Sequence, residues 1–145
     1  MKNWLYIIVL LFTIIACSSS KTNNTVATSS EVSKSLNDTI RIANDELQYE
    51  VIIIDPGFSS WLASMAHSRS YHSQSFLENK NRIYITEWNR RVLQTQLYSP
   101  NLYEMTINYE PFIDYGYEVN YLIYNYMIYF QNTYKQKLDG YVPTR

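Results

Sequence analysis

Apolar and polar positions divide the chain into three kinds of segment. A continuous apolar run occupies residues 4–15, a polar stretch without aromatic side chains follows over 18–38, and periodic patterns fill the rest. Residues 39–43 alternate as a half-buried strand does. Residues 47–55 are apolar on both faces toward their end, which is typical of a strand at or near the centre of a sheet. We therefore expect one folded domain, at residues 39–145.

Residues 75–94 are predicted to form a long helix. They begin with a capping box, and their apolar positions fall on one stripe. Two acid–base pairs have the i,i+4 spacing of ion pairs on the outer face: Glu78 with Arg82, and Glu87 with Arg91. A strand over 82–86 is the rival interpretation, because those residues alternate. The spacing of the charged pairs favours the helix.

A second long helix is predicted near the end of the chain. Its apolar side chains follow helical spacing: Val119, Leu122, Ile123, Tyr126, Met127, Phe130 and Tyr134. No charged residue lies between Glu118 and Lys135, so a membrane span has to be weighed. Four Asn and Gln residues in that window argue against a span. We expect a helix that is buried against the sheet or a partner.

Two shorter elements complete the predicted fold. A short helix is expected through residues 61–65, after Asp55 and Pro56, and residues 103–109 alternate as a strand with one buried face. The fold class is therefore α+β: a small sheet of two to four strands covered by two long helices and one short helix. The order of the strands cannot be read from these patterns.

The start of the chain has the form of a membrane-targeting segment. Lys2 precedes the apolar run, which is shorter than the roughly 20 residues of a comfortable transmembrane helix. Its end, Ile14 to Cys17, resembles the lipobox of bacterial lipoproteins, in which the cysteine becomes the lipidated N-terminus. We expect a signal peptide at 1–16, then lipidated Cys17 and a flexible tether to residue 38. An ordinary signal peptide or anchor with an incidental cysteine is the alternative.

The residues after Cys17 indicate to which membrane of the cell envelope a lipoprotein of this kind is sorted. Residues 18–30 contain one lysine and no acid, unlike the acidic cluster that follows the cysteine in surface-exported lipoproteins of the Bacteroidota. Ser18 also differs from the aspartate associated with retention in the inner membrane. These resemblances imply an outer-membrane lipoprotein whose domain faces the periplasm.

Composition narrows the classes of function. With 12 basic and 13 acidic residues, the chain has no basic excess of the kind that nucleic acid attracts. Cys17 is its only cysteine, so lipidation would leave the domain without a disulfide or a thiolate site. The chain has 15 tyrosines, whose rings and hydroxyls suit half-buried faces and interfaces. We expect no cofactor.

One candidate for catalysis or metal binding combines Asp55 with His67 and His72. Asp55 follows a strand, and the two histidines lie in a polar segment just downstream. A periplasmic hydrolase or metal enzyme built on them is the alternative function. No H-E-x-x-H or G-x-S-x-G motif supports it, and the three glycines offer no phosphate-binding loop. Asp55 before Pro56 is interpreted instead as a helix cap.

A binding surface is the preferred hypothesis. Aromatic and arginine side chains are the types enriched at interface hot spots. The candidates are Trp61, Arg69, Tyr115, Tyr117, Tyr121 and Tyr124. Core packing is the competing role for each ring. This predicts a non-enzymatic module that binds a protein or glycan partner.

Three stretches resemble a known family. Residues 49–58, 87–91 and above all 113–121 (Ile-Asp-Tyr-Gly-Tyr-Glu-Val-Asn-Tyr) are similar to small Bacteroidota lipoproteins known only as a domain of unknown function. The resemblance covers residues 47–138. It implies a location in the cell envelope, and it brings no activity or catalytic residue with it.

Overall fold

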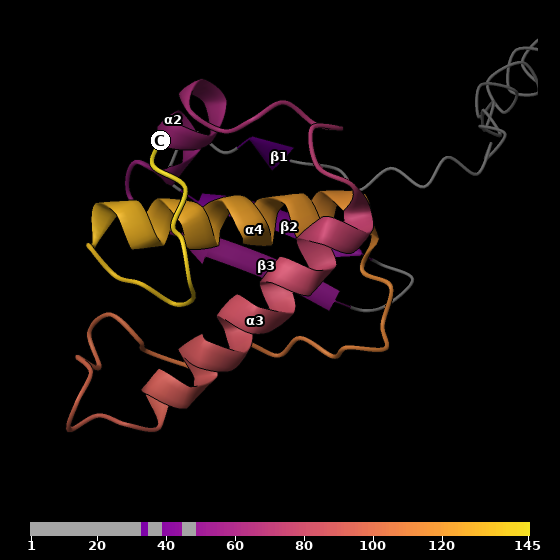
Figure 1. The fold of residues 1–145 in the computed structure, drawn as a ribbon. Coiled ribbons are helices and arrows are strands. Elements are labelled where there is room, and N and C mark those ends of the chain that lie inside the picture. Colours follow the sequence, from indigo (N-terminus) through magenta and orange to yellow (C-terminus); the bar gives the residue numbers. More distant parts are fainter. Residues whose placement is uncertain (1–32, 35–38, 45–48) are drawn as a thin grey trace, which may run out of the picture.

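The structure is a computed structural model that describes residues 33–34, 39–44 and 49–145. Its elements follow the order β1 (Ser33–Lys34), β2 (Thr39–Asn44), β3 (Tyr49–Ile54), α2 (Phe58–Ser64), α3 (Gln74–Val92) and α4 (Gly116–Thr133). The predicted signal peptide, Cys17 and most of the tether lie outside the described residues. Figure 1 shows α4 lying over the sheet, with α3 running obliquely past it. The α+β prediction, with two long helices and one short one, is confirmed.

The sheet has three antiparallel strands in the order β1-β2-β3. β2 and β3 pair along their full length, from Thr39 opposite Ile54 to Asn44 opposite Tyr49. β3 is therefore an edge strand of the described sheet, and its prediction as a central strand is wrong. Its second apolar face misled the prediction, because Ile52 and Ile54 are 53% and 75% exposed.

The predicted strand over 103–109 is also wrong. The segment has no regular secondary structure and pairs with no strand of the described sheet. Its alternation reflects one partly buried face, on which Tyr103 is 2% exposed while Met105 is largely exposed. Side chains of α3 hold its backbone, so the pattern arises without a neighbouring strand.

α4 forms the centre of the domain. Twelve of its 18 residues are buried, and its apolar stripe belongs to one hydrophobic cluster with Ile40 and Ile53 from the sheet and Leu77, Tyr84 and Trp88 from α3. No helix in the described part of the chain has both the length and the hydropathy of a membrane span. The buried amide side chains of Asn120, Asn125 and Gln131 each donate to the carbonyl four residues earlier, while the Asn125 side-chain oxygen has no partner among the described residues.

α3 begins slightly earlier than predicted. Ser73 is its N-cap, and the Ser73 hydroxyl accepts a hydrogen bond from the Phe76 amide at 3.2 Å. A buried amide pair joins the helix to α4, because Asn81 Nδ2 donates to both oxygens of Asn120 at 2.9 and 3.1 Å. Of the two predicted ion pairs, Glu87–Arg91 is confirmed. Glu78 instead accepts a hydrogen bond from Gln74.

Arg91 joins α3 to two distant segments. Its guanidinium donates to Glu87 at 2.6 Å, to the Tyr103 hydroxyl at 2.7 Å and to the Lys137 carbonyl. The side chain is only 9% exposed, which contradicts the prediction that this pair lies on the outer face. Arginine hydrogen bonds hold the pKa of Glu87 at about 2, with Arg90 the larger contributor.

The predicted helix cap at Asp55 is wrong as well. The N-cap of α2 is Gly57, which has φ of 94° and makes no side-chain cap bond. Only the Asp55 carbonyl takes part, accepting from the Phe58 amide at 3.1 Å. A Cβ at Gly57 would lie 3.3 Å from the Tyr129 hydroxyl, so both the backbone and the neighbouring tyrosine favour glycine.

We predict that Arg91→Ala lowers the free energy of unfolding by about 3 kcal/mol, because it leaves buried acceptors unpaired on two segments. Urea denaturation measures this change. Arg90→Ala is the matched control: Arg90 also pairs with Glu87, but its side chain is 47% exposed. The control should lose much less stability, and equal losses for the two variants would contradict the role given to Arg91.

Candidate functional site

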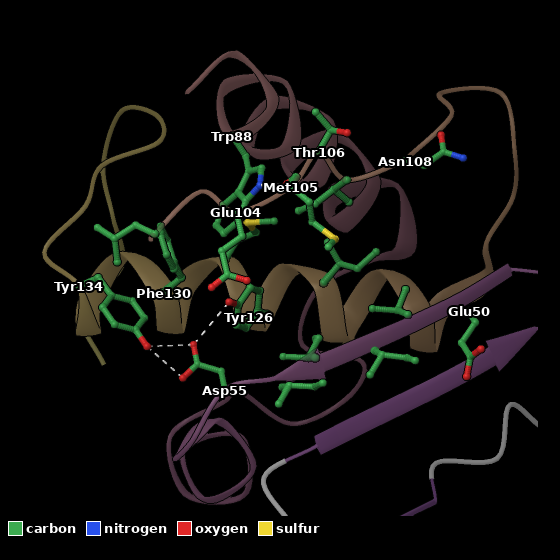
Figure 2. A pocket seen from close by; sticks show the side chains of 18 of the residues that line it. Glu50, Asp55, Trp88, Glu104, Met105, Thr106, Asn108, Tyr126, Phe130 and Tyr134 are labelled. Carbon is green, nitrogen blue, oxygen red and sulfur yellow. Dashed lines mark hydrogen bonds between the residues drawn. The ribbon is translucent and has the colours of Figure 1, made fainter. Parts of the chain in front are cut away.

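A groove of about 620 Å³ runs along the free edge of β3. We call residues 101–108 on its other side, which begin with a turn and continue without regular secondary structure, the rim segment. Residues 49–56 form one wall, the rim segment forms the second, and α3 and α4 supply the floor. Figure 2 shows the groove with Asp55 at one end of β3 and Glu50 toward the other. Its volume falls in the range of about 300–1,000 Å³ typical of ligand sites.

The groove exists because α3 holds the rim segment by side chains. Asn89 forms two bonds with the backbone of Ile107: its Nδ2 donates to the carbonyl at 2.9 Å, and its Oδ1 accepts from the amide at 2.8 Å. Trp88 Nε1 donates to the Met105 carbonyl at 2.9 Å. The amide of Ile107 is thus satisfied without a partner strand.

Within the part of the chain that the structure describes, the edge of β3 away from β2 has no strand partner, so its backbone groups can bind one. Alternate residues of an antiparallel edge strand direct both N–H and C=O away from the neighbouring strand. No backbone hydrogen bond joins β3 to the rim segment within the described residues. The contact between these walls is a side-chain bond, from the Tyr49 hydroxyl to the Asn108 carbonyl at 2.9 Å.

The floor of the groove is apolar and aromatic. α4 contributes Ile123, Tyr126, Met127 and Phe130, and Trp88 reaches it from α3. The Trp88 and Phe130 rings lie 4.7 Å apart between centroids. Packed rings of this kind form a rigid surface on which side chains of a ligand gain contact area.

Asp55 closes one end of the groove. The carboxylate is 5% exposed and lies among tyrosine hydroxyls of α4 and its C-terminal end. Tyr134 donates to it at 3.1 Å, Tyr129 lies 3.2 Å away and Tyr126 lies 3.4 Å away. Figure 2 shows Tyr126 and Tyr134 directed toward it. Burial and the negative charge of Asp55 raise the pKa of these hydroxyls, so they remain donors at neutral pH.

The predicted binding residues lie elsewhere, where α4 meets the loop of residues 65–73. Arg69 donates to both oxygens of Glu118 at 2.7 and 2.9 Å and lies over the Tyr121 ring. Tyr117 accepts from the Ser70 amide at 2.8 Å, and Tyr121 donates to the His67 carbonyl at 2.7 Å. These side chains attach the loop to α4.

The other predicted rings also make contacts within the domain. Tyr115 is 2% exposed, stacks on Tyr109 and accepts from the Glu110 amide. Tyr124 is 2% exposed, and Trp61 is half-buried against the core. The structure therefore does not gather the six candidates into one open aromatic patch.

The proposed catalytic or metal-binding trio is not brought together. The His67 and His72 rings are 6.0 Å apart, and they contact Tyr71 and Tyr124. Asp55 instead bonds to tyrosines nearer the C-terminal end of α4. Within the described residues, no three His, Cys, Asp or Glu side chains are placed to hold one metal ion.

The sequence contained a partial signal for the groove. Tyr126 and Phe130 belong to the apolar stripe of α4 that was predicted, and Met105 to the alternating segment. Neither pattern showed that the two meet beside an open strand edge, because that depends on the long-range bonds of Trp88 and Asn89. The tyrosines around Asp55 are 71 to 79 residues away in sequence.

Comparison with known proteins identifies a family, but the function of that family is unknown. No match was found among curated proteins or among solved structures. A family model described as a family of unknown function (DUF6146) matches residues 5–145, which is nearly the whole chain. The chain belongs to this family of unknown function, DUF6146.

Proposed function

We propose that this protein is a lipid-anchored envelope lipoprotein, not an enzyme, that binds an extended peptide segment of a partner protein in the groove beside β3. The observation that carries the proposal is the free edge of β3 along an apolar floor. An extended segment added to such an edge gains backbone hydrogen bonds, while alternate side chains enter pockets.

The dimensions of the groove fit this mode of binding. β3 has six residues, which corresponds to about 20 Å of strand. An added strand of similar length would place every second side chain over Ile123, Met127 and Phe130. A glycan fits less well, because one wall is strand backbone and sugar rings gain little from its regularly spaced donors and acceptors.

The lipobox-like sequence supports the membrane setting. Acylation of Cys17 with two or more chains would make attachment to the membrane nearly permanent. We propose an outer-membrane location with the domain on the periplasmic face, where the groove would meet exposed strands or tails of other envelope proteins.

Selection from a library of random peptides tests the binding function. The full chain, solubilised in detergent, should enrich peptides with alternating apolar residues. Met105→Arg should weaken their binding at least about 10-fold, because it places a charged side chain at the groove. Phe112→Arg is the matched control, since Phe112 is 97% exposed, lies outside the groove and should leave affinity unchanged.

Two outcomes of that selection would contradict the peptide function. One is equal binding of the enriched peptides to both variants, which would place them outside the groove. The other is that no peptide is enriched, while peptidoglycan fragments bind the wild-type protein and bind the Met105→Arg variant more weakly. Isothermal titration calorimetry gives the affinities in each case.

Metabolic labelling tests the anchor separately. In a bacterial host that processes lipoproteins, the wild-type chain should incorporate an alkyne analogue of palmitate and sediment with membranes. Cys17→Ala should incorporate no label, because the thiol that accepts the lipid is gone. Labelling of the alanine variant at the wild-type level would rule out lipidation at Cys17.

A further inference from the structure

The carboxylate at the end of the groove has incomplete hydrogen bonding. The Tyr129 hydroxyl is closer to the Pro56 carbonyl, at 2.8 Å, than to Asp55, at 3.2 Å. A hydroxyl has one proton to donate, so Asp55 receives little from it. Tyr126 lies at 3.4 Å, which is long for a bond between oxygens. Tyr134 is left as the main donor, whereas a carboxylate accepts about four bonds.

Asp55 also lacks a counter-charge. Of the ion pairs formed by the described residues, none includes it. Tyrosine hydroxyls supply only dipoles, and a buried carboxylate without a cation is costly. A cation that entered through the groove would complete the hydrogen bonding and neutralise the charge together.

The charge of the groove has a single sign. Among the described residues, its only charged lining side chains are Glu50, Asp55 and Glu104, and none of the described Lys, Arg or His residues lines it. Glu50 pairs with Arg41. Figure 2 shows Glu104 directed into the groove from the rim segment, toward the end that holds Asp55. This end therefore complements positive charge.

Aromatic faces surround the same end. Tyr126, Phe130 and Tyr134 line the groove there, and Tyr134 is 37% exposed. Ring faces attract cations, and they also cover the methylene stem of a lysine or arginine. Carboxylate and rings together match a side chain with an apolar stem and a charged head.

We propose that the Asp55 end of the groove is a subsite for a lysine or arginine side chain of the bound peptide segment. The subsite rests on the proposed function, because the segment along β3 delivers the cation. The stem lies against Tyr126 and Phe130, and the charged head donates to the free oxygen positions of Asp55. Glu104 covers the head from the rim segment.

The sequences of the selected peptides give the first test. The subsite predicts a lysine or arginine at one fixed position relative to the alternating apolar residues. Peptides that bind in the groove without a cation at a fixed position would overturn the subsite and leave the peptide function standing. A selection that enriches nothing overturns the peptide function itself.

A comparison of matched peptides gives the second test. An enriched lysine peptide should bind wild-type protein at least about 10-fold more tightly than its norleucine analogue. Asp55→Asn should bring that ratio close to one, and Glu104→Gln should lower it in part. Glu110→Gln is the control, because Glu110 is exposed on the same connection but lies outside the groove.

The measurements separate recognition from a structural role. If Asp55→Asn weakens both peptides equally, Asp55 only supports the fold and the subsite is overturned. If Asp55→Asn does not fold, wild type and Glu104→Gln still decide the question. Equal affinities of wild type for the lysine and norleucine peptides would then overturn the subsite.

Discussion

The two hydrogen bonds between Asn89 and the backbone of Ile107 determine the form of this domain. An extended segment must satisfy its amides and carbonyls, and the usual solution is to pair with a strand. Here the side chain of a helix takes that place. With Trp88 bonded to the Met105 carbonyl, the rim segment is held on α3, and β3 remains an edge. The groove exists because a side chain, and not a neighbouring strand, binds the backbone of the rim segment.

The tyrosines explain how one helix can contact so many segments. A tyrosine ring packs in the core while its hydroxyl reaches a backbone group farther out. Tyr121 does this for the 65–73 loop, Tyr129 for the turn at Pro56, and Tyr115 for Glu110. α4 therefore organises loops on several sides mainly through tyrosine hydroxyls, with the Glu118–Arg69 ion pair as a charged contact to the 65–73 loop. At Asp55, this arrangement leaves a carboxylate that receives fewer hydrogen bonds than it can accept.

Periodicity predicted the elements that depend on local pattern. The ranges of α3 and α4, the short α2 and the strands β2 and β3 all lie close to their predicted positions. The 103–109 segment was predicted wrongly, because alternation reports which face is buried and not what pairs with the backbone. Asp55 was predicted as a cap from its neighbour Pro56, yet its partners come from α4. Tyr115 and Tyr124 were candidates for an open surface, but their ring chemistry suits a core equally well. Contacts that span tens of residues leave no periodic signal.

The central claim is that an extended segment pairs with the free edge of β3. Amide hydrogen exchange of the full chain, followed by NMR with and without a selected peptide, measures this most directly. The account predicts new protection at alternate β3 amides from Tyr49 to Ile54, while the amides already paired with β2 change little. Protection confined to the 65–73 loop, with the β3 amides unchanged, would contradict it.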